Sequence, residues 1–115
     1  MHETSLVRFT LNAVEHKAAE LGIAHVKSIR LITGELRGAL PELMQEAFRI
    51  LKRNRPVFED AELEMIVKPV VLRCRECGTE YQKADFHDVR CPSCGETDFE
   101  IISGSELYID SFEGE

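Results

Sequence analysis

Two CxxC motifs, each followed by a glycine, constrain the fold of this 115-residue chain more than any other feature. The first reads CREC at 74–77 and the second CPSC at 91–94, and 13 residues separate them. Two cysteines three positions apart on a tight turn present both sulfurs to one point, and tetrahedral zinc needs four such ligands at about 2.3 Å. The glycine after each pair allows the left-handed backbone that folds the turn back beneath a metal. The sequence therefore predicts one structural Zn(II) site with four ligands: Cys74, Cys77, Cys91 and Cys94.

Other uses of these cysteines are less consistent with the pattern. An iron centre with the same four thiolates is the main alternative metal site. Disulfides are disfavoured because the first twenty residues lack the apolar segment of a signal peptide, so the protein is expected to be cytoplasmic. Four thiolates leave no open position for a substrate water, which indicates structure or interaction rather than catalysis. His87, between the pairs, is interpreted as an exposed loop residue rather than an exchange ligand.

Hydrophobic periodicity predicts an α+β fold, with two helices on a small mixed three-stranded sheet and the zinc ribbon inserted as a module. Thr4 or Ser5 is the expected N-cap of the first helix, and Gly22 is its expected C-terminal stop. The expected elements are an amphipathic helix over 5–22, a strand over 26–33, a helix from Pro41 that ends before Asn54, and strands over 63–67 and 106–112.

This pattern divides the chain into two expected domains. Residues 1–69 and 104–115 together form the larger α/β domain, which must carry its own hydrophobic core. Residues 70–103 form the zinc-ribbon domain, which buries too little apolar surface to fold without its metal.

The net charge of −7 is concentrated near the C-terminus. Residues 96–115 hold seven acidic residues and no Lys or Arg, so residues 1–95 are formally neutral. Nucleic-acid binders normally carry a surplus of positive charge, and this balance favours a basic protein partner or a cation instead. No apolar run approaches the roughly 20 residues of a membrane helix, so no membrane partner is expected.

The N-terminus is the other place where metal donors gather. The sequence contains no nucleophile–base set and no phosphate-binding loop, so an enzyme is not expected. The amine of Met1 and the amide and ring nitrogens of His2 can close adjacent chelate rings around one ion, with Glu3 as a fourth donor. Nitrogen donors in a plane suit Ni(II) or Cu(II), whereas zinc prefers a tetrahedron.

Taken together, these motifs resemble the hydrogenase-maturation nickel metallochaperones (HypA/HybF type). The resemblance covers nearly the whole chain and rests on the opening MHE, the VKSIRLITGEL strand and turn, the two CxxCG motifs and the GSELYI strand. It implies a non-enzymatic protein that binds Ni(II) through His2, Glu3 and the amine of Met1, and zinc through the four cysteines. Glu35 and Glu42, near the glycine turn, are candidates to complete the nickel shell.

The resemblance also implies partners. These are a nickel-handling maturation GTPase, the hydrogenase large subunit and, in some bacteria, urease maturation proteins. The expected state of the protein is a monomer or a weak homodimer.

A rival interpretation is a zinc-ribbon interaction module that binds nucleic acid or a transcription-type partner. Four basic residues in or beside the ribbon keep this alternative open: Arg73, Arg75, Lys83 and Arg90. The acidic C-terminal segment counts against it. A redox dithiol protein is a third interpretation, which tightly bound zinc would exclude.

Overall fold

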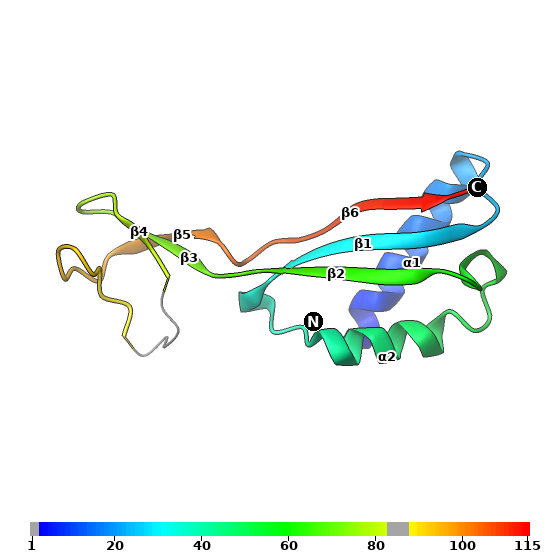
Figure 1. Ribbon diagram of the computed structural model, residues 1–115, viewed down its shortest axis with the longest axis horizontal. Helices are drawn as coiled ribbons and strands as arrows, with labels where there is room; N and C mark the ends of the chain where they lie inside the picture. The colour runs from blue at the N-terminus through cyan, green and yellow to red at the C-terminus, as the bar shows by residue number, and fades with distance from the viewer. Residues whose placement is uncertain (1–2, 83–87) are drawn as a thin grey trace.

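Two three-stranded sheets lie at opposite ends of an elongated molecule in the computed structural model, which describes residues 3–82 and 88–115 (Figure 1). Its extents are 55 × 25 × 16 Å. The elements in chain order are α1 (Glu3–Glu20), β1 (Val26–Gly34), the 3-10 turn η1 (Glu35–Arg37), α2 (Pro41–Leu51), the 3-10 turn η2 (Pro56–Phe58), β2 (Glu62–Lys68), β3 (Val71–Cys74), β4 (Glu80–Tyr81), β5 (Phe99–Ser103) and β6 (Leu107–Gly114).

The larger sheet has the strand order β2-β1-β6, with β1 in the centre. β1 runs parallel to β2, so that Ile29 lies beside Leu63, and antiparallel to β6, where Ile29 lies beside Phe112. Parallel neighbours need a crossover connection, and α2 supplies it. The predicted fold class, two helices on a small mixed sheet with an inserted cysteine module, is confirmed.

The main hydrophobic core lies between this sheet and the two helices. Alternation along β1 turns Ile29 and Leu31, both at most 1% exposed, toward the helices, while Arg30 between them is exposed. The side chains of α2 that complete the core are Met44 and Phe48. The buried residues of α1 recur at helical spacing, and they are Leu6, Val7, Thr10, Leu11, Val14 and Ala18.

The first helix begins earlier than the sequence pattern predicts. α1 starts at Glu3, so Thr4 and Ser5 lie within its first turn, and the prediction that one of them caps it was wrong. A carboxylate in the first turn is favourable there because the N-terminal end of a helix carries partial positive charge. The predicted stop is correct: Gly22 has φ 72°, and the amide of Ile23 donates to the carbonyl of Ala18 at 2.8 Å.

The smaller sheet has the strand order β4-β3-β5 and its own cluster of buried side chains. Tyr81 anchors the cluster, since its ring is buried and its hydroxyl donates to the carbonyl of Val89 at 2.7 Å. Strand β5 was not predicted, because two adjacent apolar residues, Ile101 and Ile102, break the alternation that marks a strand. In the structure both side chains are substantially exposed. The other buried members of the cluster are Val70, Leu72, Cys74 and Cys91.

Two glycines join the sheets by direct backbone contact. The amide of Gly34, the last residue of β1, donates to the carbonyl of Glu106 at 2.7 Å, and the amide of Leu36 donates to the carbonyl of Gly104 at 2.8 Å. A Cβ atom on Gly34 would lie 2.0 Å from the carbonyl oxygen of Gly104. The sheets separate at residues 69–70 and 104–106, but independent folding of the two predicted domains remains a prediction.

Glu106 also stabilises this junction through its side chain. Its carboxylate accepts a hydrogen bond from the amide of Gly104 at 2.7 Å. The backbone N–H of Glu106 itself and that of Gly104 favour the charged carboxylate and lower its pKa below the ordinary value.

The contact at Gly34 predicts a steric penalty for any side chain. Gly34→Ala should lower the free energy of unfolding by on the order of 1–3 kcal/mol, because the added methyl group meets backbone that cannot rotate away. Urea unfolding followed by far-UV circular dichroism measures the change. Ser28→Ala, on the same strand at a partly exposed position, should change stability by less than about 0.5 kcal/mol. Equal stabilities of the two variants would contradict the contact.

The lowered pKa of Glu106 predicts a pH-dependent contribution to stability. A carboxyl group whose pKa is lower in the folded chain stabilises it above the unfolded-state pKa, and this stabilisation is lost as the pH falls through the folded-state pKa. Glu106→Gln should therefore be less stable than the parent at pH 6, and the difference should shrink at pH 3. Urea midpoints at both pH values test this, with the exposed Glu59→Gln as control. A difference that is unchanged between pH 6 and pH 3 would remove the carboxylate from the junction.

Candidate metal centre

Each CxxCG motif folds into the same hydrogen-bonded turn. In the first, the amide of Cys74 donates to the carbonyl of Thr79, and the amide of Gly78 donates back to the carbonyl of Cys74, both at 2.9 Å. Gly78 has φ 78°, a left-handed conformation that disfavours residues with a side chain. The second turn has the same two bonds at 2.9 Å and a glycine of φ 79°, and its corresponding residues are Cys91, Gly95 and Glu96.

The two turns face one another and bring the four sulfur atoms together. The Sγ atoms of Cys74 and Cys94 lie 3.5 Å apart, as do those of Cys77 and Cys91. All four sulfurs lie within 4.8 Å of one another. These distances are far longer than the roughly 2.05 Å of a disulfide bond, and the cysteines are free. Four sulfurs at about 2.3 Å from one ion would be about 3.8 Å apart, so the cluster fits a tetrahedral metal.

The cluster lies half in the ribbon core and half at its surface. Cys74 and Cys91, the first cysteine of each pair, are buried, whereas Cys77 and Cys94 are exposed. The buried pair is held by the strand β3 and by the packing around Tyr81. The exposed pair closes the site toward solvent, so the cluster is anchored on one side and accessible on the other.

Hydrogen bonds lower the pKa values of two of the thiols, those of Cys77 and Cys91. The hydroxyl and the backbone amide of Thr79 lower the pKa of Cys77 to about 6, since both favour the thiolate. Burial opposes ionisation of Cys91, but the amides of Cys94 and Ser93 outweigh it and lower its pKa. A thiolate is the form that binds a metal, so the turns themselves supply part of the deprotonation.

The thiol of Cys94 is the hardest of the four to ionise, because the other three sulfurs lie close to it. The amide of Glu96 favours the Cys94 thiolate, but partial desolvation of its sulfur and the hydrogen bonds with the other three thiols raise the pKa of Cys94 to about 12. Four thiolates at these distances would repel one another strongly, and a divalent cation removes that repulsion. The donor set therefore fits a cation of the zinc type.

Two hydroxyl residues link the turns, and sequence reasoning did not identify them. Thr79 Oγ1 lies 3.2 Å from Cys77 Sγ and 3.2 Å from Ser93 Oγ. The amide of Ser93 in turn donates to Cys91 Sγ at 3.4 Å. The only signal in the sequence is a small hydroxyl residue within or just after each CxxC turn, which is too common to mark a site.

The predicted nickel ligands are only partly within the described residues. Met1, His2 and the ribbon residue His87 lie outside them. Glu3 is partly exposed at the start of α1, and the two candidates for the remaining ligand, Glu35 and Glu42, are exposed in the first turns of η1 and α2. Within residues 3–82 and 88–115, the four cysteines are the one group of His, Cys, Asp and Glu side chains whose ligand atoms converge. The nickel site therefore remains a prediction.

The basic residues of the ribbon are paired with carboxylates, which weakens the nucleic-acid interpretation. Each of the three described ones forms an ion pair of 2.9–3.1 Å that neutralises its charge locally. Lys83 lies outside the described residues. The pairs are Arg73 with Glu80 and Glu100, Arg75 with Asp98, and Arg90 with Asp88.

Membrane association through a spanning helix finds no support either. Over the described ranges, neither α1 nor α2 combines the length and the hydropathy needed to cross a bilayer.

Comparison with known proteins identifies the family. The family model described as "Hydrogenase/urease nickel incorporation, metallochaperone, hypA" matches residues 1–114. The hydrogenase maturation factor HypA of Moorella thermoacetica is 45% identical over 115 residues, which are 100% of both chains. The solution structure of the Ni metallochaperone HypA from Helicobacter pylori superposes with a TM-score of 0.67 at 24% identity, over 99% of this chain and 97% of that one.

A second HypA solution structure gives a TM-score of 0.73 at 24% identity, over 99% of this chain and 96% of that one. At this identity the two structures establish a shared fold. The family match over 1–114 and the full-length similarity to the Moorella protein go further. On these grounds, the chain belongs to the HypA family of nickel-incorporation proteins.

Proposed function

We propose that this protein is a nickel metallochaperone that helps deliver Ni(II) to the large subunit of [NiFe] hydrogenase during maturation. The observation that carries the proposal is the family match over residues 1–114, joined to a cysteine cluster with the geometry of a structural metal site. The protein carries its cargo without catalytic turnover and works in the cytoplasm. The family description also includes urease, which makes urease maturation a second client.

Nickel is proposed to bind at the N-terminus through Met1, His2 and Glu3. Support comes from the start of α1 at Glu3. The first amides of a helix have no acceptor within it, so the amide of Glu3 can bind or lose its proton without breaking a helical hydrogen bond. A chelate of amine, amide and imidazole nitrogens suits planar Ni(II) and releases the ion as protons compete for it. Such a site allows transfer to an acceptor.

The four cysteines are proposed to hold Zn(II) as a structural ion. Zinc bound there would neutralise the thiolates and hold the two turns together. The proposed partners are a nickel-handling maturation GTPase and the hydrogenase large subunit, with urease maturation proteins where urease is the client. The paired arginines of the ribbon disfavour the alternative, a ribbon that binds nucleic acid.

Loss of the imidazole should remove nickel binding selectively. Isothermal titration with Ni(II) should give micromolar or tighter affinity for the parent and no measurable binding for His2→Ala, with the zinc content unchanged. His16→Ala is the matched control, because His16 is exposed and pairs with Glu20 at 3.0 Å. One extra residue before Met1 should also weaken binding, since it moves the free amine. Unchanged nickel affinity in His2→Ala would rule out the N-terminal site.

Removal of one thiolate should release the structural ion. Cys74→Ser should lose zinc, measured as metal per chain by plasma mass spectrometry, and should unfold residues 70–103 while helical circular dichroism is retained. Ser93→Ala, which keeps all four thiolates beside an altered turn, should retain one zinc per chain. If Cys74→Ser held zinc as tightly as the parent against a chelator, the four-thiolate site would be wrong.

A further inference from the structure

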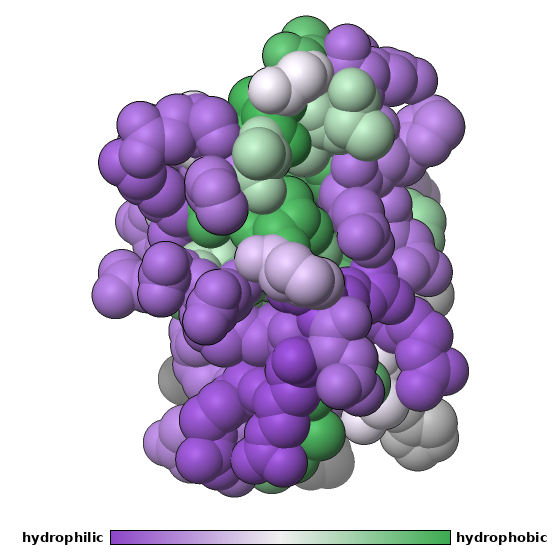
Figure 2. Space-filling view, turned by 90° about the vertical axis from the view of Figure 1, so that its right-hand side faces the viewer, coloured by the Kyte–Doolittle hydropathy of each residue, from purple (hydrophilic) through white to green (hydrophobic). Residues whose placement is uncertain are grey.

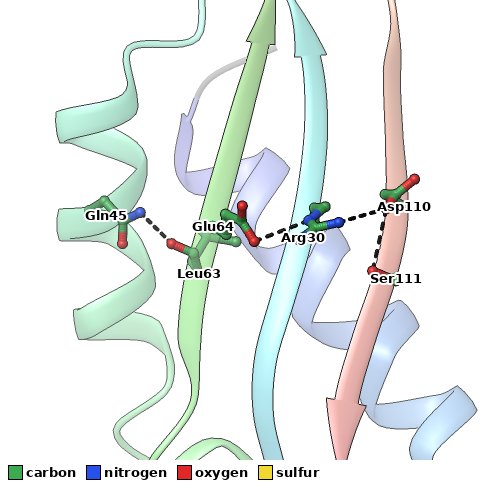
Figure 3. Close-up of polar contacts among 6 residues, drawn as sticks. All are labelled: Arg30, Gln45, Leu63, Glu64, Asp110 and Ser111. Atoms are coloured by element: carbon green, nitrogen blue, oxygen red, sulfur yellow. Dashed lines mark hydrogen bonds and ion pairs between the residues drawn. The ribbon is translucent and has the colours of Figure 1, made fainter.

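The two edge strands of the larger sheet, β2 and β6, differ in how far other residues cover them. The β2 edge is covered by α2, from which Gln45 Nε2 donates to the carbonyl of Leu63 at 2.6 Å (Figure 3). Just beyond these elements, Lys52 Nζ donates to the carbonyl of Ala61 at 2.9 Å. These two side chains thus occupy carbonyl acceptors at the start of the β2 edge, where an added strand would otherwise bind. This is a common way to protect an exposed sheet edge.

The β6 edge has no such cover in the described part of the chain. β6 is the terminal strand of the sheet, with β1 as its one partner there. Beside it, a groove of about 410 Å³ runs between β6 and the second half of α1. Its apolar lining consists of Ala13, Val14, Leu21, Ile23, Ile109 and Phe112. Figure 2 views the end of the molecule where β6 finishes, and apolar surface gathers in its upper half between hydrophilic residues.

Leu21, just after α1, adds exposed apolar surface to this groove. Its side chain is 59% exposed at the end of α1, beside partly buried Ile23 and Phe112. A strand added to β6 would place alternate side chains over this lining, because successive residues of a strand point to opposite faces. The groove therefore favours an occupant whose side chains on this face are apolar.

Acidic side chains on the solvent-facing side of β6 favour a positively charged occupant. Asp110 lies on the open face of the sheet, where its carboxylate is 3.8 Å from Arg30, whose closer partner is Glu64 at 3.0 Å (Figure 3). Glu113 is exposed further along the same strand. Residues 96–115 contain no Lys or Arg. An added strand would therefore meet carboxylates on this face, and Lys or Arg at its intervening positions would be complementary.

The same charges argue against a second copy of this chain at the edge. Two β6 strands paired with one another would bring Asp110 and Glu113 of one copy close to the same residues of the other. Like charges across paired strands are destabilising. The acidic strand thus disfavours self-pairing and favours a basic partner.

We propose that the β6 edge and its groove form a docking site for an extended segment of a protein partner, which adds to the sheet as a fourth strand and alternates apolar with basic residues. Backbone hydrogen bonds to β6 supply the affinity, and the groove together with the carboxylates supplies the selectivity. The docking site is independent of the nickel and zinc sites, so it stands or falls separately from the proposed carrier function.

A designed peptide tests this docking site directly. The probe is a ten-residue capped peptide of alternating Lys and Val, titrated into the full-length zinc-loaded protein and followed by amide hydrogen exchange and NMR. Binding should slow exchange at those amides of β6 that point away from β1. Two controls keep the composition: one groups the Lys and Val residues in blocks, and one carries N-methyl groups on alternate residues. Both should bind at least about tenfold more weakly.

Matched protein variants separate the groove from general attraction of a basic peptide. Leu21→Lys should weaken binding by about tenfold or more, whereas Ile50→Lys, the same kind of change at a 49% exposed position on α2, should not. Glu113→Gln should weaken peptide binding more than the control Glu59→Gln, an exposed position away from β6. The proposal would be overturned if the block peptide bound equally well, if Leu21→Lys bound like the parent, or if β6 were protected without peptide in a dimer seen by sedimentation.

Discussion

Pairing of β1 with two strands of opposite direction is the constraint on which the rest of this structure depends. Its parallel partner β2 requires a crossover, and α2 provides it while covering the core. Its antiparallel partner β6 must return from the far end of β2, and the cysteine ribbon fills that connection. The ribbon is therefore both an appendage and the loop that closes the larger sheet.

This connectivity gives a physical reason why the metal state of the ribbon can influence the larger domain. A folded ribbon brings the ends of β2 and β6 together, whereas an unfolded one makes them the ends of a long loop. The entropy of closing such a loop grows slowly with length, by about 0.6 kcal/mol per doubling, so this effect alone is modest. The backbone contact of Gly34 with the Gly104 segment is the more direct connection, because it leaves no room for adjustment.

Features of the fold that depend on local pattern could be predicted from the sequence, and features that depend on distant partners could not. Alternation marked β1, β2 and β6, and Gly22 and Pro41 marked helix ends. The start of α1 was missed, because Thr4 and Ser5 are good caps but the helix extends past them to Glu3. The cysteine spacing predicted the cluster. Its links through Thr79 and Ser93 depend on how the two turns face each other, which no local pattern encodes.

The two proposed metal sites differ in the property that matters for a carrier, which is the cost of releasing the ion. Loss of an ion from the cysteine cluster would leave four thiols crowded within 4.8 Å, one of them with a pKa raised to about 12. A ribbon with so small a core would unfold rather than hold that arrangement, so release there is coupled to unfolding. The proposed nickel donors are an amine, an amide and an imidazole, and protons can replace the metal on them one at a time. On the proposed assignment, the chain would separate a structural ion from a transported one by placing only the structural ion against a hydrophobic core.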